Sequence, residues 1–221
     1  MKTNLFIGAH PDDIEFGCGG TVAKLIEQGQ RCVFIVATKG DQGSVKLSAE
    51  ELAKIRRQEA IASAELLGAS DIEFLELPDG LTSYSFQDKI RLIEIIRKYK
   101  PYSVFTHSQF DHHPDHQIIH EMTITSIKSA AGPWFKEAKG EPHHVPNILG
   151  YEVWNPINEY QTAVDITAQI DKKIAALDLH VSQTEDYPYT NAIRGLANYR
   201  GAMINGEGCA EVFEVLRLKT F

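Results

Sequence analysis

Two short segments of the chain combine the residue types that bind metal ions and move protons. The first is Ala9-His-Pro-Asp-Asp-Ile-Glu15, which holds one imidazole and three carboxylates within six residues. Such groups repel one another when they are buried, unless a cation neutralises them. His10 and one aspartate supply the nitrogen and oxygen ligands that zinc accepts. The alternative is a solvated turn, in which Pro11 bends the chain and Asp12 caps a helix.

The second segment, His107–His120, contains five of the nine histidines. Pro114 suits the first turn of a helix, which would place His116 and His120 on one helix face, just after His113. The spacing leaves two metal-binding pairs open: His113 with His116, or His116 with His120. Two histidines and a carboxylate leave coordination positions free, as catalytic zinc sites require. Non-haem iron oxygenases use the same ligands on β-sandwich folds, so an α/β chain favours zinc.

Other conspicuous residues are interpreted as structural. His112, His143 and His144 are expected in loops or on the surface, and His180 is expected to compensate a helix dipole. Gly17-Cys-Gly-Gly20 lacks the G-x-G-x-x-G spacing and follows several acidic residues, so it does not predict a dinucleotide site.

Short apolar runs alternate with helical patterns along the chain. Strands are predicted at Asn4–Ala9, Cys32–Thr38, Ile72–Leu75, Ser103–Thr106, Ile148–Val153, Ala163–Ile166 and Val212–Leu218. Helices are predicted at Thr21–Gln28, from the Ser48–Glu51 capping box to Gly68, and at Phe86–Tyr99, Pro114–Ala130, Thr167–His180 and Asn191–Ile204. This order predicts one domain over residues 1–221, a Rossmann-like three-layer α/β/α fold with a mainly parallel sheet. Both histidine segments follow predicted strands, at the edge where such sheets bind ligands.

Composition excludes several classes of protein. A length of 221 residues suits a single core. The 22 basic and 30 acidic residues give a net charge of −8, which argues against nucleic acid or an anionic membrane as a partner. The three cysteines form no CxxC pair, which predicts a reducing, cytoplasmic location without disulfides. No segment approaches the roughly 18 apolar residues of a membrane span, and the oligomeric state, a homo-oligomer included, stays open.

The two segments together resemble the PIG-L (LmbE-like) family of zinc-dependent N-deacetylases. This family includes N-acetylglucosaminyl-phosphatidylinositol, mycothiol-pathway and bacillithiol-pathway deacetylases, and the resemblance is to its short bacterial members. Further matches are Arg56-Arg-Gln-Glu59, Leu77-Pro-Asp-Gly80, Arg97-Lys-Tyr-Lys-Pro101, Arg200-Gly201 and Ala210-Glu-Val-Phe213. Cys209 stands where the family often has a tyrosine before the last of these motifs.

The resemblance implies a metal centre and a base. His10, Asp13 and His116 match the zinc ligands, with one ion per chain and other divalent metals as alternatives. Asp12, adjacent to the ligand Asp13, matches the general base. Removal of a proton by a positioned base is typically worth about 10²–10⁴-fold in rate.

The resemblance also implies residues that act on the substrate. His113, oriented by Asp115 and therefore cationic, is expected to stabilise the oxyanion. Arg56 matches an arginine that contacts substrate, and Arg57 is the alternative if the register differs by one residue.

The predicted function is removal of the acetyl group from an N-acetylglucosamine-type sugar conjugate. The alternatives are a non-catalytic sugar- or metal-binding module on the same fold and a metal-dependent phosphoesterase, which would need ligands for two ions. Lys39–Leu47 and Asp186–Thr190 are expected near the pocket. Trp134 and Phe135 either stack on the sugar or anchor their own loop.

Overall fold

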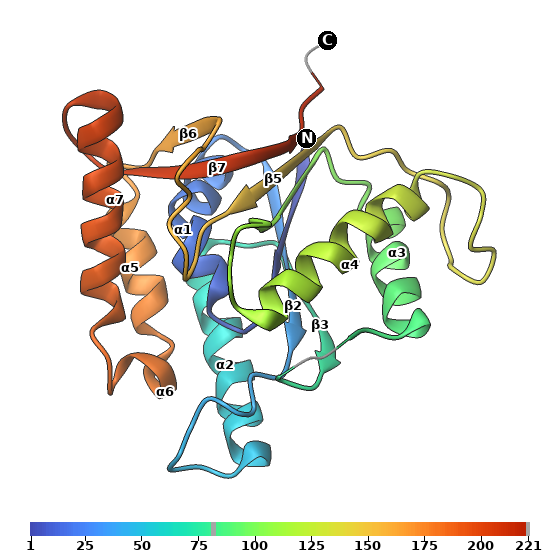
Figure 1. Cartoon of the computed structure of the whole chain (residues 1–221), viewed down its shortest axis with the longest axis horizontal. Helices are drawn as coiled ribbons and strands as arrows, with labels where there is room; N and C mark the ends of the chain where they lie inside the picture. Colours follow the sequence, from blue (N-terminus) through green and yellow to red (C-terminus); the bar gives the residue numbers. More distant parts are fainter. Residues whose placement is uncertain (81–82, 220–221) are drawn as a thin grey trace.

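The computed structural model describes residues 1–80 and 83–219, and its centre is a seven-stranded sheet (Figure 1). The strands are β1 (Thr3–Gly8), β2 (Arg31–Thr38), β3 (Asp71–Leu77), β4 (Ser103–His107), β5 (Asn147–Tyr151), β6 (Thr162–Asp165) and β7 (Ala210–Arg217). The helices are α1 (Asp13–Glu27), α2 (Ala49–Leu67), α3 (Phe86–Tyr99), α4 (Pro114–Ala130), α5 (Ile170–Asp178), α6 (Val181–Thr184) and α7 (Tyr189–Asn205).

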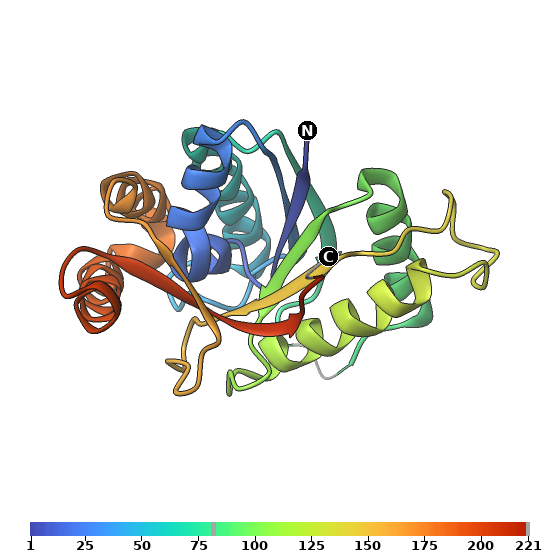
Figure 2. The same cartoon turned by 90° about the horizontal axis from the view of Figure 1, so that it is seen from above.

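The sheet lies between two helical layers, as Figure 2 shows. Helices α3 and α4 cover one face, and α1, α2, α5 and α7 cover the other. Strand side chains alternate between the two cores: Leu5 and Ile7 pack in the core that contains α3 and α4, and Phe6 packs in the core that contains α1. The strand order is β3-β2-β1-β4-β5-β7-β6, with β7 antiparallel to both of its neighbours. The predicted three-layer, mainly parallel α/β/α fold is confirmed.

The direction in which strands are added reverses between β1 and β4. The chain runs outward from β1 through β2 to β3, and then returns to place β4 on the other side of β1. Strands β1 and β4 pair in parallel, with Asn4 opposite Ser103 and Phe6 opposite Phe105. A crevice opens at the carboxyl ends of the strands at such a switch point. The two histidine segments follow these two strands, so the topology brings them together.

Helix α1 differs from its prediction. It begins at Asp13 rather than Thr21, and its backbone is kinked at Cys18 (φ −148°, ψ 20°). Beyond the kink, the carboxylate of Glu211 on β7 accepts the N–H groups of Gly20 at 2.9 Å and Thr21 at 2.7 Å. This carboxylate caps the second half of the helix from a distant strand, an interaction that local sequence patterns do not reveal.

The Gly17-Cys-Gly-Gly20 segment is a packing site. A Cβ at Gly17 would lie 2.2 Å from the Tyr151 ring, and one at Gly20 would lie 2.6 Å from Cδ1 of Ile166. These glycines let helix α1 approach its neighbours closely. Over the described ranges 1–80 and 83–219, no helix combines the length and the apolar character needed to cross a membrane.

Candidate active site

Three predicted metal ligands meet at the switch point between β1 and β4. His10 follows β1, Asp13 begins α1, and His116 lies in the first turn of α4. Nδ1 of His10 lies 3.3 Å from Oδ2 of Asp13 and 3.3 Å from Nε2 of His116. Nε2 of His116 lies 3.3 Å from Oδ1 of Asp13. All three side chains are buried.

Carboxylates lie behind both imidazole rings. Nδ1 of His116, on the ring side away from the cluster, lies 3.2 Å from Oδ2 of the buried Asp111. Nε2 of His10 lies 3.1 Å from Oδ2 of Asp115 and 3.2 Å from Oδ1 of Asp79. A carboxylate on the far nitrogen orients a metal-binding histidine and makes it a stronger ligand.

The carboxylates create a strongly negative potential at the cluster. Burial alone would lower the pKa of both rings, but Asp13 and Asp115 raise the pKa of His10, and Asp13 and Asp111 raise that of His116 to about 9. Burial alone would raise the pKa of Asp13, but the positively charged imidazoles lower it well below its usual range. This field favours positive charge at the point where the three predicted ligand atoms converge.

These residues fit a divalent cation. Two imidazole nitrogens and a carboxylate converge within 3.3 Å of one another, and this donor set suits zinc. Three further sets of residues could also hold an ion, because within each set the ligand atoms lie within 4.8 Å of one another. These sets are His10, His113 and His116; Asp13, His107 and His116; and His10, Asp79 and Asp115.

Asp12, the predicted base, has an arginine partner. Nη2 of Arg56 on α2 lies 2.9 Å from Oδ1 of Asp12, and Nη1 donates to the Gly40 carbonyl at 3.0 Å. Asp12 occupies the N-cap position of α1, but its side chain accepts no capping hydrogen bond from that helix. Arg57, the alternative to Arg56, instead pairs with Glu76 at the surface.

The expected pairing of Asp115 with His113 is wrong. Asp115 Oδ2 accepts from the Gly80 N–H at 2.9 Å and faces His10, because residues two apart at a helix start point in different directions. The pKa of His113 is lowered rather than raised. Burial and the charges of His116 and His10 lower it and outweigh Asp115 and Asp13, which raise it, so this direction favours a neutral ring over the expected cation.

His107 belongs to the cluster, although it was not among the predicted site residues. Its ring stacks on His116 with centroids 3.8 Å apart, and its Nε2 accepts the Ala9 N–H at 2.9 Å. Burial and the charge of His116 lower the pKa of His107 to about 4, so the ring is neutral. The histidine-rich segment was the available signal, but only the β1–β4 pairing shows that this ring supports the start of the first segment.

The remaining histidines lie outside the cluster. Nδ1 of His120 bonds to the His107 carbonyl at 2.7 Å. Among residues 1–80 and 83–219, no group of possible metal-ligating atoms includes His120, whereas one group contains both His113 and His116. His112 is exposed and bonds to Asn155. His180 is buried with Nε2 3.6 Å from Oε2 of Glu15. Burial lowers the pKa of His180 and the Glu15 carboxylate raises it, with a net rise. Its expected role in compensating a helix dipole stays a prediction.

A pocket of about 330 Å³ opens onto the cluster. Its lining residues are His10, Asp12, Asp13, Phe16, Gln42, Gly43, Arg56, Asp79, Gly80, His113, Val153, Trp154 and Gln183. Gln42 and Gly43 belong to the predicted rim loop Lys39–Leu47. From the other expected rim segment, Tyr189 packs against Phe16 with ring centroids 5.4 Å apart.

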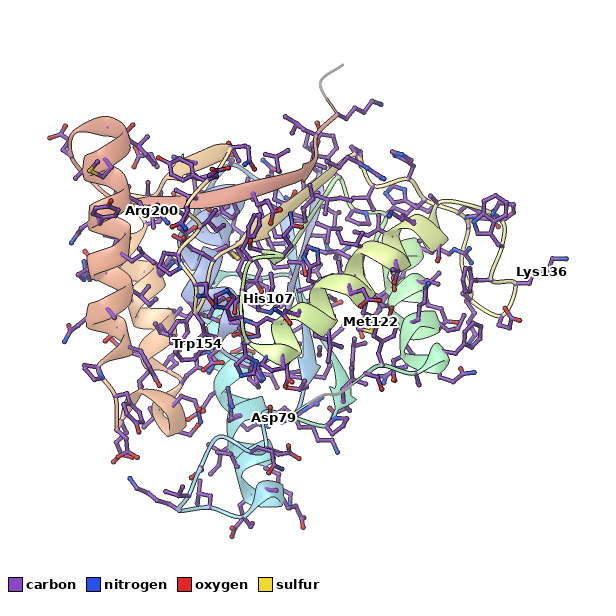
Figure 3. All side chains as sticks on the ribbon, viewed as in Figure 1. Asp79, His107, Met122, Lys136, Trp154 and Arg200 are labelled. Atoms are coloured by element: carbon purple, nitrogen blue, oxygen red, sulfur yellow. The ribbon has the colours of Figure 1, made fainter. Side chains whose placement is uncertain are left out.

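The aromatic residues that line this pocket are Phe16 and Trp154, not the two considered from the sequence. Figure 3 shows Asp79, His107 and Trp154 grouped near the centre of the molecule and Lys136 at its far end. Phe135, beside Lys136, stacks on Phe86 of α3 with ring centroids 6.0 Å apart. Of the two expectations, anchoring of its own loop is the one that fits Phe135.

Several known proteins are similar to this chain in sequence and in fold. The model of the PIG-L family, described as GlcNAc-PI de-N-acetylase, matches residues 5–127. A diacetylchitobiose deacetylase of Thermococcus kodakarensis is 32% identical and is aligned over 92% of this chain and 79% of its own length. A 4-oxalmesaconate hydratase of Pseudomonas putida is 28% identical, with 96% and 90% covered.

A solved structure extends the likeness to nearly the whole fold. The N,N'-diacetylchitobiose deacetylase from Pyrococcus horikoshii is 30% identical and superposes with a TM-score of 0.86, covering 97% of this chain and 84% of the other. The family match includes both histidine segments and spans more than half of the chain. The chain therefore belongs to the PIG-L family.

Proposed function

We propose that this chain is a zinc-dependent hydrolase that removes the acetyl group from an N-acetylglucosamine-type sugar conjugate. His10, Asp13 and His116 hold the ion in this proposal. Support comes from the family match and from relatives named as deacetylases. We further propose that residues 1–221 act as one deacetylase domain, because β5, β7 and β6 extend the same sheet beyond the matched region.

The observation that carries the proposal is the position of Asp12. Its carboxylate lines the pocket next to the ligand Asp13, and Arg56 holds it at 2.9 Å. A protein that merely binds a metal or a sugar has no need of such a carboxylate beside the metal centre. A hydrolase needs one, because water must lose a proton as it attacks an amide.

Asp12 and His113 have different roles in the proposed reaction. A bound zinc ion would lower the pKa of water toward about 7 and polarise the acetyl carbonyl. Asp12 accepts the proton of the attacking water and returns it to the amine nitrogen as the C–N bond breaks. A neutral His113 has one ring N–H, which donates a hydrogen bond to the carbonyl oxygen as negative charge develops there.

The test compares the zinc-loaded protein with an Asp12→Asn variant. We expect one zinc per chain in both proteins, with amine release from diacetylchitobiose in the wild type and a loss of about 10²–10⁴-fold in the variant. Two metal ions per chain with phosphate-ester cleavage would favour the phosphoesterase. Sugar binding without amine release in the wild type would favour the non-catalytic module.

A further inference from the structure

Trp154 is the large half-exposed aromatic residue of the active-site pocket. Its side chain is 50% exposed, and it lines the pocket together with the buried Phe16. The Trp154 ring contacts Phe16 and Tyr189, with centroids 6.1 Å and 5.8 Å apart. An indole that packs against two aromatic rings and stays half exposed offers a surface on which a flat apolar ligand face can lie.

The backbone of Trp154 is tied to the metal centre. Oδ2 of Asp111 accepts the Trp154 N–H at 3.1 Å, and the same oxygen lies 3.2 Å from Nδ1 of His116. One buried carboxylate therefore positions both a predicted metal ligand and this indole.

A buried ion pair fixes the rest of the Trp154 loop. Arg200 on α7 contacts Glu152 through two nitrogens, with Nε 3.1 Å from Oε1 and Nη2 2.7 Å from Oε2. Nη2 of Arg200 also donates to the Ile157 carbonyl at 2.8 Å, and Glu152 accepts the Ile157 N–H at 2.6 Å. Both ends of the segment 152–157 are thus held against α7. Such a buried pair adds little net stability over apolar packing, but it specifies one loop conformation.

The rest of the lining indicates the chemistry of the ligand. Beside Phe16 and Trp154, the walls contain the amides of Gln42 and Gln183, and the cation Arg56 is already paired. A suitable ligand is uncharged, with one apolar face and an edge of hydroxyl groups. A pyranose ring has this character.

We propose that Trp154 is the platform on which the sugar ring of the substrate stacks, and that the Arg200–Glu152 pair is a clamp that holds this platform in place. This inference rests on the proposed deacetylase function. Trp154 is a binding residue in it, and Arg200 is a positioning residue that acts through the loop.

Fluorescence can report on the platform directly, because the chain has two tryptophans. A Trp134→Phe variant keeps Trp154 as the one tryptophan, so excitation of tryptophan reports on this residue, and Asp12→Asn slows turnover during the titration. With zinc bound, we expect N-acetylglucosamine and diacetylchitobiose to produce a saturable change in Trp154 emission. Trp134→Phe alone should leave deacetylase kinetics unchanged.

Kinetics test the contribution of stacking. We expect Trp154→Ala to raise KM for diacetylchitobiose about tenfold with kcat within about twofold, and Trp154→Phe to recover most of the loss. Arg200→Gln should raise KM severalfold at constant kcat and shift the Trp154 emission to longer wavelength. The control is Arg194→Gln on the same helix, whose partner Asp171 is 88% exposed.

Several results would overturn the inference. A folded Trp154→Ala variant with unchanged KM would contradict the stacking role of Trp154, and so would a Trp154 emission that neither sugar changes. The deacetylase proposal would still stand if the wild type releases the amine. If Arg200→Gln lowers only the melting temperature, with KM and emission unchanged, the clamp is structural. Absence of amine release in the zinc-loaded wild type would contradict the deacetylase function itself. The fluorescence titration would still show whether the sugar binds at Trp154, because it does not depend on turnover.

Discussion

Arg56 on α2 and Asp12 at the N-cap of α1 form a buried ion pair, with Nη2 of the arginine 2.9 Å from Oδ1 of the aspartate. The two residues are 44 positions apart in the sequence. The arginine side chain is 4% exposed, so the pair is largely shielded from water.

Replacement of Arg56 should therefore affect both stability and turnover. Arg56→Ala leaves the Asp12 carboxylate without its partner, and we expect a loss of about 3–5 kcal/mol in the free energy of unfolding. Arg57→Ala removes a half-exposed pair with Glu76 and should cost less than about 1 kcal/mol. Urea unfolding and deacetylase assays of both variants test this, and equal losses would contradict it.

Asp111 should control the affinity for the metal. It lies behind His116, and loss of such an orienting carboxylate typically weakens metal binding about 10–100-fold. We expect this loss for Asp111→Asn in titrations with buffered zinc. Asp171→Asn, an exposed aspartate on α5, is the matched control. An unchanged zinc affinity in the Asp111 variant would mean that His116 is not a ligand.

Variants of His113 and His116 should show that turnover and metal binding depend on different residues. We expect His113→Ala to keep its zinc and to lose about 10²–10³ in kcat, because the ring donates to the oxyanion. His116→Ala should lose zinc and activity together. Metal analysis of the purified variants is the measurement, and the reverse pattern would exchange the two roles.

Gly17 should not tolerate a side chain. Its Cβ would meet the buried Tyr151 ring at 2.2 Å, and we expect Gly17→Ala to destabilise the fold by about 1–3 kcal/mol. Gly195 on α7 has open space around it, so Gly195→Ala should stabilise the protein by about 0.5–1 kcal/mol. In thermal unfolding, the melting temperature should fall for Gly17→Ala and rise for Gly195→Ala.

Cys32 should make the fold sensitive to alkaline pH. Burial raises the pKa of its thiol to about 12, whereas an unfolded cysteine ionises near about 8.5. The unfolded state therefore loses this proton first, and stability falls as pH rises above about 8.5, by up to about 1.4 kcal/mol per pH unit. Urea unfolding between pH 8 and 10 should show a shallower fall for Cys32→Ala, and equal slopes would refute the assignment.

Local patterns predicted most of the secondary structure. The boundaries of α3 and α4 agree with their predictions, and the Ser48–Glu51 capping box begins α2 as expected. These features depend on neighbouring residues, such as a cap, a proline at the helix start or a run of apolar side chains. Helix α1 was predicted to begin at Thr21, just beyond its kink at Cys18, rather than at Asp13. The cap of this second half is Glu211, 191 residues away from Gly20, so no local pattern reveals how the two halves are held.

The chain itself determined the order of strands and helices, and hence the edge of the sheet where the two histidine segments meet. Residue types and spacing marked the two segments as a metal site, because these are local properties. The resemblance to the PIG-L family then implied His10, Asp13 and His116 as ligands and Asp12 as the base. The tertiary structure decided which side chains face one another: Asp115 faces His10, Arg56 faces Asp12, and Trp154 lines the pocket. These contacts depend on side-chain directions and on the packing of distant elements, which no local pattern encodes.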